Sequence, residues 1–165
     1  MQKGLTIIEF LIYIAILTMA IAAMGLVSSN VFQVGVRNDV VQEVSHNGRF
    51  AMQKIGQLVR KSSGIIEPEP ETERNRLELS FEDPTKNPTV FDVSSEGKLI
   101  IKEGEGEYYK ETELTTSRVV INKLVFKKVS EDSLRVEMNI SFYNPQDLPE
   151  YEFKSFFISS FTLKN

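Results

Sequence analysis

A run of 18 apolar residues near the N-terminus, residues 10–27, is interrupted by a single strongly polar side chain, Thr18. As an α-helix this run extends about 27 Å at 1.5 Å per residue, which nearly spans the hydrocarbon core of a bilayer. Including residues 5–8 extends the stretch to the usual transmembrane range of about 20 residues, but the stretch then contains Glu9. A charge inside the bilayer costs about 2.5–3.5 kcal/mol on insertion scales, so Glu9 requires an explanation.

Two general interpretations of this segment leave something unexplained. A secretory signal fits the positive Lys3 and the small-residue site at Ala20 and Ala22. Its apolar region, however, is longer than the typical 7 to 15 residues, and Glu9 weakens it. A plain single-pass anchor accounts for the length but not for Glu9.

The first ten residues, MQKGLTIIEF, resemble the signature of type IV prepilins. That signature has a short basic leader, a glycine, an apolar residue at the cut and a glutamate fifth after it. The resemblance implies cleavage between Gly4 and Leu5 by a membrane-embedded prepilin peptidase, N-methylation of the new Leu5 amine and assembly into a filament. Leu5 replaces the phenylalanine that is commonest at this place in the family.

The motif also has a physical rationale. Gly4 gives a protease close access to the backbone, because it carries no side chain. Lys3, the leader charge, is retained on the cytoplasmic side, so the chain after about residue 27 is expected to lie outside the membrane. Glu9 lies one helical turn below the freed amine of Leu5, and a cation from a neighbouring subunit would offset its cost in hydrocarbon. We therefore expect Leu5 and Glu9 to form the assembly contact.

The composition leaves few means for catalysis. The chain of 165 residues has a net charge of -4, no cysteine and one histidine, His46. Thiol chemistry, disulfides, a histidine triad and a multi-histidine metal site are thereby excluded within one chain. The basic residues are scattered, which does not indicate a nucleic-acid surface. We expect no enzymatic activity, no cofactor and no metal site.

The apolar segment is expected to continue as an amphipathic helix to about residue 61 or 62. Apolar residues recur at helical spacing, namely Val36, Val40, Val44, Ala51, Ile55 and Leu58. Gly64 supplies a stop signal after two serines. Gly25 and Gly35 each cost about 1 kcal/mol relative to alanine. Gly25 is consistent either with a locally loosened turn or with close helix packing.

The remainder of the chain is expected to form an antiparallel sheet. Residues 67–73 are a charged, proline-interrupted segment, predicted as an exposed loop. Alternation of period two then predicts strands, at 77–81, 90–93, 99–101, 118–129, 134–142 and 151–163. The predicted fold is α+β and pilin-like, with the sheet packed on the helix face from Val40 to Leu58. The predicted parts are a leader at 1–4, a transmembrane and assembly helix at 5–29 and an exported head at 30–165, with the amphipathic helix at 30–62 and the sheet at 74–165.

Three further segments look like minor pilins of the J or W type: residues 47–55, 120–126 and 160–165. The C-terminal cysteine pair that many major pilins carry is absent. The resemblance therefore implies a minor subunit.

The remaining candidate sites have ordinary structural interpretations. Two acidic clusters, at residues 67–73 and 103–107, lack the spacing of a calcium loop and are interpreted as solvated loops. His46 lies away from the apolar stripe, on the helix surface. Phe157 and Phe161 are assigned to the core, whereas Phe156 and Ile158 fall on the opposite strand face, which is available to a partner.

Two functions remain. The first is a structural minor pilin or pseudopilin subunit, near the tip or as initiator of a type IV pilus, a competence apparatus or a type II secretion pseudopilus. Its implied partners are other pilin subunits, the prepilin peptidase, the inner-membrane assembly platform and membrane lipid, with no nucleic acid. The alternative is a single-pass membrane protein whose exported β domain binds a ligand or a cell-wall component. In both, the C-terminal domain is extracytoplasmic.

Overall fold

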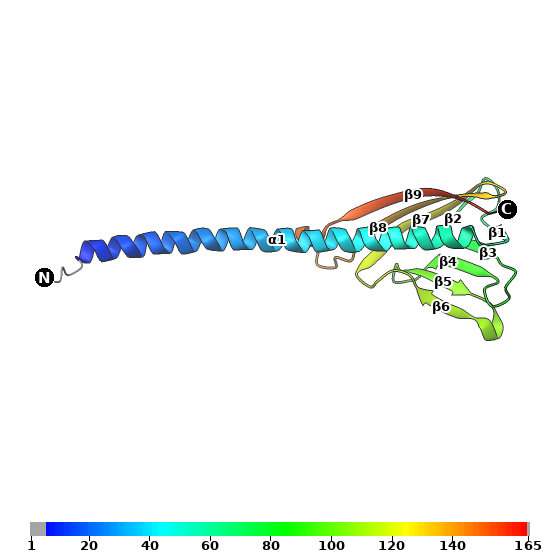
Figure 1. The fold of residues 1–165 in the computed structure, drawn as a ribbon, viewed down its shortest axis with the longest axis horizontal. Coiled ribbons are helices and arrows are strands. Elements are labelled where there is room, and N and C mark those ends of the chain that lie inside the picture. The colour runs from blue at the N-terminus through cyan, green and yellow to red at the C-terminus, as the bar shows by residue number, and fades with distance from the viewer. Residues whose placement is uncertain (1–5, 165) are drawn as a thin grey trace. The chain divides into compact units, whose positions relative to one another are not determined.

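The computed structural model describes residues 6–164, except for the side chains of residues 29, 30 and 33. Its contacts divide the chain into two compact units, residues 1–38 and residues 39–165. Helix α1, Ile7–Val59, contributes to both units (Figure 1). The two units are described separately below.

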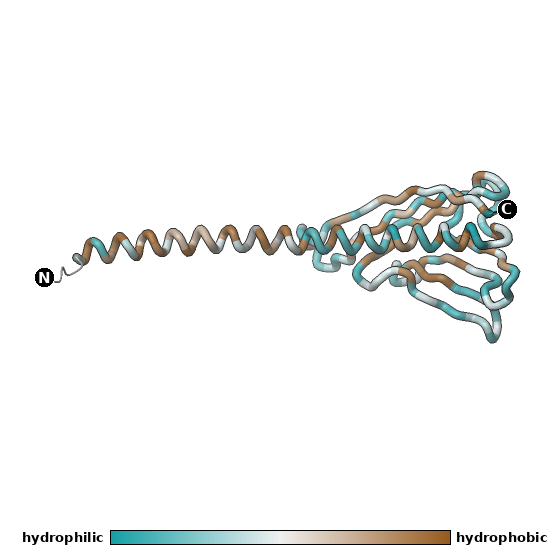
Figure 2. Tube along the Cα trace, viewed as in Figure 1, coloured by the Kyte–Doolittle hydropathy of each residue, from teal (hydrophilic) through white to brown (hydrophobic). Residues whose placement is uncertain are grey.

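The first unit is helical from Ile7 onward and apolar along most of its length, as the brown colour in Figure 2 shows. The helix continues without a break through Gly25 and Gly35. A Cβ atom at either glycine would meet no other atom within 4 Å. The helix is thus regular at Gly25 in the single chain, and loosening of this turn on assembly stays a prediction.

In the second unit, one face of α1 packs against the strands. The predicted core positions from Val40 to Leu58 are buried, whereas Val36 is only half-buried. Met52 and Val59 belong to the same hydrophobic cluster as Val44 and Ile55. The predicted packing of the sheet on the face from Val40 to Leu58 is thus confirmed. The helix ends at Val59, three residues before the predicted boundary at 62. There the Ser62 hydroxyl donates to the Val59 carbonyl at 2.8 Å and so satisfies one of the last free carbonyls of the helix.

The strands form two antiparallel sheets, which lie on opposite sides of the C-terminal part of α1 in Figure 1. The five-stranded sheet has the order β1-β3-β4-β5-β6. Its strands are β1 (Gly64–Glu67), β3 (Leu77–Ser80), β4 (Thr89–Val93), β5 (Leu99–Glu103) and β6 (Lys110–Glu113). A 3₁₀ turn, η1 (Gly106–Tyr108), precedes β6.

The four-stranded sheet has the order β2-β7-β8-β9. Its strands are β2 (Glu73–Arg74), β7 (Val119–Ser130), β8 (Ser133–Phe142) and β9 (Lys154–Thr162). The turn between β8 and β9 contains a second 3₁₀ turn, η2 (Pro149–Tyr151). Strand β8 follows the predicted alternation, because Leu134, Val136, Met138 and Ile140 are all buried.

Three expectations from the sequence are corrected by these strands. The single predicted sheet is two sheets, and the first strand begins at Gly64 rather than after residue 73. The predicted exposed loop at 67–73 begins in β1 and ends in β2, and Pro68 within it is buried. Strand β6 has no counterpart in the sequence pattern, because all four of its residues are exposed and no alternation marks it.

One hydrophobic core joins the helix to both sheets. Its largest fully buried side chains include Ile55 from α1, Phe91 from β4 and Phe126 from β7. Such a core, formed by a helix and antiparallel sheets, gives the second unit an α+β fold, as predicted.

Candidate functional site

The residues predicted to be processed lie outside the described part of the chain. Lys3, Gly4 and Leu5 precede Thr6, where the described structure begins. The leader charge, the cleavage site and the methylated amine therefore remain predictions. The structure does describe Glu9, the other predicted assembly residue.

Glu9 forms a reciprocal cap with Thr6 at the start of α1. The Thr6 backbone N–H donates to Glu9 Oε2 at 3.2 Å, and the Glu9 backbone N–H donates to Thr6 Oγ1 at 3.3 Å. The Thr6 hydroxyl also donates a hydrogen bond to Glu9 Oε2 at 3.2 Å. This arrangement is a capping box, in which a threonine and a glutamate three residues later satisfy free N–H groups at a helix start.

The capping box gives Glu9 a local role that sequence reasoning missed. The sequence does contain the signature of a capping box, because Thr6 and Glu9 have the required spacing and stand directly before an apolar run. Both hydrogen bonds to the carboxylate use Oε2. A carboxylate has about four acceptor positions, so the cap leaves Glu9 able to accept a further donor.

The helix that follows Glu9 is apolar and unburied. Residues Ile7–Ser28 are long and apolar enough to cross a membrane, and none of this span is buried by the described structure. Most of its large side chains are more than half exposed, including Ile7, Phe10 and Leu17. In water such a surface is unfavourable at roughly 25 cal/mol per Å². Lipid or other apolar helices are the environments that suit it.

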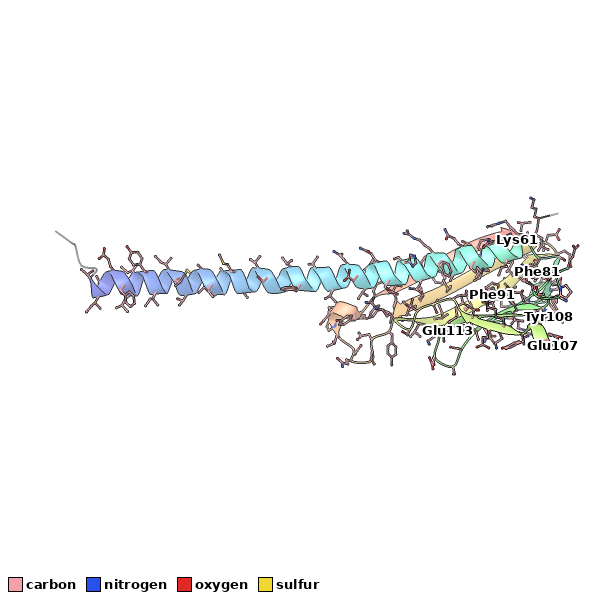
Figure 3. The ribbon with its side chains drawn as sticks, turned by 60° about the horizontal axis from the view of Figure 1, so that its bottom comes forward. Lys61, Phe81, Phe91, Glu107, Tyr108 and Glu113 are labelled. Atoms are coloured by element: carbon pink, nitrogen blue, oxygen red, sulfur yellow. The ribbon has the colours of Figure 1, made fainter. Side chains whose placement is uncertain are left out.

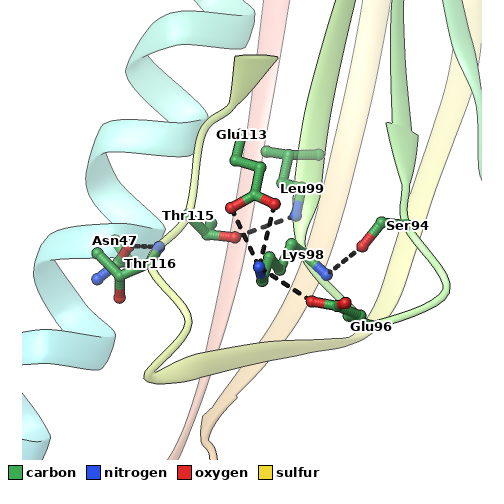
Figure 4. Close-up of polar contacts among 8 residues, drawn as sticks. All are labelled: Asn47, Ser94, Glu96, Lys98, Leu99, Glu113, Thr115 and Thr116. Atoms are coloured by element: carbon green, nitrogen blue, oxygen red, sulfur yellow. Dashed lines mark hydrogen bonds and ion pairs between the residues drawn. The ribbon is translucent and has the colours of Figure 1, made fainter. Parts of the chain in front are cut away.

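In the second unit, a polar cluster joins α1 to the segment between the two sheets (Figure 4). Asn47 is buried, and its Oδ1 accepts the Thr116 N–H at 3.0 Å. Its Nδ2 donates to the backbone carbonyl and the carboxylate of Glu43 at 2.9 and 3.0 Å. Glu43 also accepts the Thr116 hydroxyl at 2.7 Å and pairs with Arg118 at 3.3 Å. The sequence placed Asn47 only in a family-like segment, and this structural role was not predicted.

A second polar cluster secures the beginning of β5 (Figure 4). Lys98 Nζ pairs with Glu96 and Glu113, each at 3.0 Å. The ammonium of Lys98 donates to both carboxylates, and these hydrogen bonds, to Glu96 first and then to Glu113, raise the pKa of Lys98 above its usual value of 10.5. Nearby, the buried Thr115 hydroxyl accepts the Leu99 N–H at 3.0 Å. The contacts fix strand geometry and place no nucleophile beside a base.

An open concavity of about 600 Å³ lies at the C-terminal end of α1. Figure 3 shows two of its lining residues, Lys61 and Phe81, at this end of the helix. Lys54 and Lys86 also line it, beside Asp83 and Glu103. The charges are mixed and the concavity is open, so it does not have the enclosed, mostly apolar form of a small-molecule site.

The acidic clusters do not converge on a metal site. Across the described residues 6–164, no three histidine or acidic side chains are grouped so that they could hold a metal ion. Glu105 and Glu107 are exposed around η1, and His46 is exposed on α1. Each therefore has the solvated position that the sequence indicated.

Comparison of the chain with models of protein families, with curated proteins and with solved structures finds no match. The likeness to prepilins thus rests on the residues themselves. Of the first ten residues, which carry the likeness, the structure describes Thr6 to Phe10. It also describes the α+β unit that contains the three later segments.

Proposed function

We propose that this chain is a minor pilin or pseudopilin, a structural subunit rather than an enzyme. One observation carries the proposal. An unburied apolar helix begins at Ile7, with a capping box between Thr6 and Glu9, and the Lys3-Gly4-Leu5 motif stands directly before Thr6. A plain membrane anchor needs the apolar helix but has no use for that motif.

The two ends of α1 have different environments in this proposal. The span Ile7–Ser28 lies in the membrane and later against the helices of other subunits. One face of the part from Val40 to Val59 is already covered by sheet, and this part serves as the base of the exported unit. Cleavage by prepilin peptidase after Gly4 frees the amine of Leu5, which is then methylated.

Glu9 contributes to assembly through its remaining acceptor capacity. The cap occupies Oε2, so the carboxylate retains a position for the Leu5 amine of a neighbouring subunit. Pairing offsets the cost of the charge in hydrocarbon and selects one axial stagger between helices, because only one stagger brings the two groups together. The subunit acts near the tip or as initiator of a type IV pilus or a type II secretion pseudopilus, on the inner-membrane assembly platform.

The capping box allows the charge of Glu9 to be tested separately from its cap. Glu9→Gln keeps a capping-box side chain but removes the charge, whereas Thr6→Ala removes the cap hydroxyl and keeps the charge. We expect Glu9→Gln to be inserted and cleaved but to be lost from sheared filaments and from detergent co-purification with partner pilins. Thr6→Ala should retain most incorporation. Wild-type incorporation of Glu9→Gln would show that the carboxylate charge is not the assembly contact.

A further inference from the structure

The two sheets of the second unit have four edge strands: β1 and β6 in one sheet, β2 and β9 in the other. An edge strand presents unpaired backbone N–H and C=O groups, to which another strand can add. Native proteins protect such edges with short strands, charged side chains, proline or a bulge.

Three of the four edges carry this protection. Strand β1 has a register shift between Ile65 and Glu67, and Pro68 follows it. Strand β2 is two residues long, and both residues are charged. Strand β6 is four residues long, fully exposed and charged at three positions, Lys110, Glu111 and Glu113.

Strand β9 is the least protected of the four edges. It is nine residues long, contains no proline, and Lys154 is its only charged residue. Its outward-facing side chains include Phe156, which is 54% exposed, and Ile158, which is 49% exposed. A long edge with a single charge and two exposed apolar side chains, beside three protected edges, is the edge best suited to pair with a partner strand.

The hydrogen-bond pattern identifies the free backbone groups. Phe153 accepts from the Phe142 N–H at 3.1 Å, and the Leu163 N–H donates to Asp132 at 2.8 Å. The backbone N–H and C=O groups of the odd-numbered residues of β9 therefore point toward β8, because these groups point alternately to either side along an antiparallel strand. The even-numbered residues, Phe156, Ile158 and Ser160 among them, direct their backbone groups away from β8. Within residues 6–164, these three have no backbone hydrogen-bond partner.

The charge near β9 favours an acidic partner. Residues 153–164 contain two lysines and no acidic residue, although the whole chain has a net charge of -4. Acidic residues near this segment include Glu152, which precedes it, and Glu137 of β8, which lies opposite Ile158 and pairs with Arg135 at 2.8 Å. On the face of β9 that packs against α1, the Arg60 guanidinium lies 5.9 Å from the centre of the Phe161 ring. A strand that pairs with β9 would thus run beside positive charge.

We propose that the free edge of β9 binds an extended segment of a partner protein as an additional strand. The segment has alternating apolar side chains to cover Phe156 and Ile158, and it carries acidic side chains for Lys154 and Arg60. The backbone hydrogen bonds supply affinity, and the side chains at alternate positions supply selectivity.

A second copy of this chain is a poor occupant. Phe157 packs at Gly48 and Phe161 at Gly56, so β9 runs in the same direction as α1. An antiparallel pair of β9 strands would therefore point the two α1 helices in opposite directions. Two copies in one membrane cannot meet in this way, a step that rests on the proposed function.

The test uses the full chain in detergent and a labelled nine-residue peptide, with glutamate at both ends and alternating valine and threonine between. We expect saturable binding by fluorescence anisotropy. Amide exchange at Phe156, Ile158 and Ser160 should be fast in the free chain and about tenfold slower in the complex. Exchange at Phe157 and Ser159, which already face β8, should not change.

Two variants locate the binding to the edge. Ser160→Pro removes an outward N–H that makes no bond to β8, so it should weaken binding at least about tenfold with little change in melting temperature. Ile158→Glu should also weaken binding, by repelling the acidic peptide. The matched control is Val129→Glu, at an exposed apolar position of 60% exposure on β7.

The proposal is overturned if about 1 mM peptide protects none of the three amides, or if both variants bind like the unmodified chain. Self-association of the free chain that Ser160→Pro abolishes would contradict the choice of occupant. The uncleaved chain, which keeps residues 1–4, should bind the peptide equally well. Failure of peptide binding would therefore not count against the predicted cleavage after Gly4.

Discussion

Asn47 on helix α1 accepts a hydrogen bond at 3.0 Å from the backbone of Thr116, which is 69 residues away in the sequence. Thr116 lies between β6 and β7, where the chain crosses from one sheet to the other. This bond ties that crossing to the helix. It is an interaction of folding rather than of assembly.

We predict that Asn47→Ala lowers the free energy of unfolding of the second unit by about 1–3 kcal/mol, because it leaves the Thr116 N–H without its acceptor. The measurement is urea denaturation followed by circular dichroism. Gln53→Ala, at an exposed position of the same helix, is the control and should change stability by less than about 0.5 kcal/mol. Equal effects from the two variants would mean that the bond contributes nothing.

Replacing Gly48 or Gly56 by alanine should destabilise the fold, whereas the same change at an ordinary helix glycine stabilises it. Glycine to alanine in a helix usually stabilises by up to about 1 kcal/mol. Here a Cβ at Gly48 would overlap the ring of Phe157, and one at Gly56 would overlap the ring of Phe161. We predict that both alanine variants lower the melting temperature of the second unit.

Two controls separate this clash from helix propensity. The Cβ atom that Gly35→Ala adds would meet nothing within 4 Å, so this variant should not destabilise the chain. Combining Gly48→Ala with Phe157→Ala should cost less than the sum of the two single changes, because the clash is removed. Additive losses would show that the close approach of Phe157 is not the cause.

The fold was predictable where a local pattern carries the information. Helical spacing identified Val44 and Ile55 as core, and alternation identified Met138, because each signal lies within one element. The separation into two sheets was not predictable. It depends on which strands pair, as when Arg74 of β2 pairs with Phe126 of β7, and no local signal encodes that choice.

The candidate site was predicted in part for the same reason. Glu9 was identified from the cost of a charge in an apolar run, whereas its bond to Thr6 required attention to helix capping rather than to hydropathy. The sequence indicated that Phe156 and Ile158 lie on a strand face available to a partner, but it did not indicate the free edge of β9. The contrast with the protected edges needed the strand order.

Asp83 offers a pH-dependent test of the loop beside the end of α1. Hydrogen bonds from the Thr85 hydroxyl first, and then from the Thr85 N–H, lower the pKa of Asp83 below 3.8. A lowered folded pKa stabilises the fold above the unfolded value, and this contribution is lost as the pH falls through the folded pKa. Thr85→Val should raise the pKa toward 3.8 in a carboxyl NMR titration, and Thr85→Ser should not. An unchanged pKa in Thr85→Val would refute the assigned cause.

We predict that Gly4→Val leaves the chain uncleaved in the membrane, because a branched side chain at the cut restricts access of the peptidase to the backbone. Immunoblotting of membrane fractions would detect the longer, uncleaved form. Val27→Leu, a conservative change in the apolar run, is the control and should be processed normally. Normal cleavage of Gly4→Val would contradict a peptidase that acts at this position.

The mass of the N-terminal peptide of the membrane-extracted protein tests the central claim most directly. If the chain is a pilin-like subunit, the peptide lacks Met1 to Gly4 and begins at Leu5 with one additional methyl group. An intact N-terminus, or a cut at another position such as after Ala22, would contradict the account and favour a membrane-anchored or secreted binding domain.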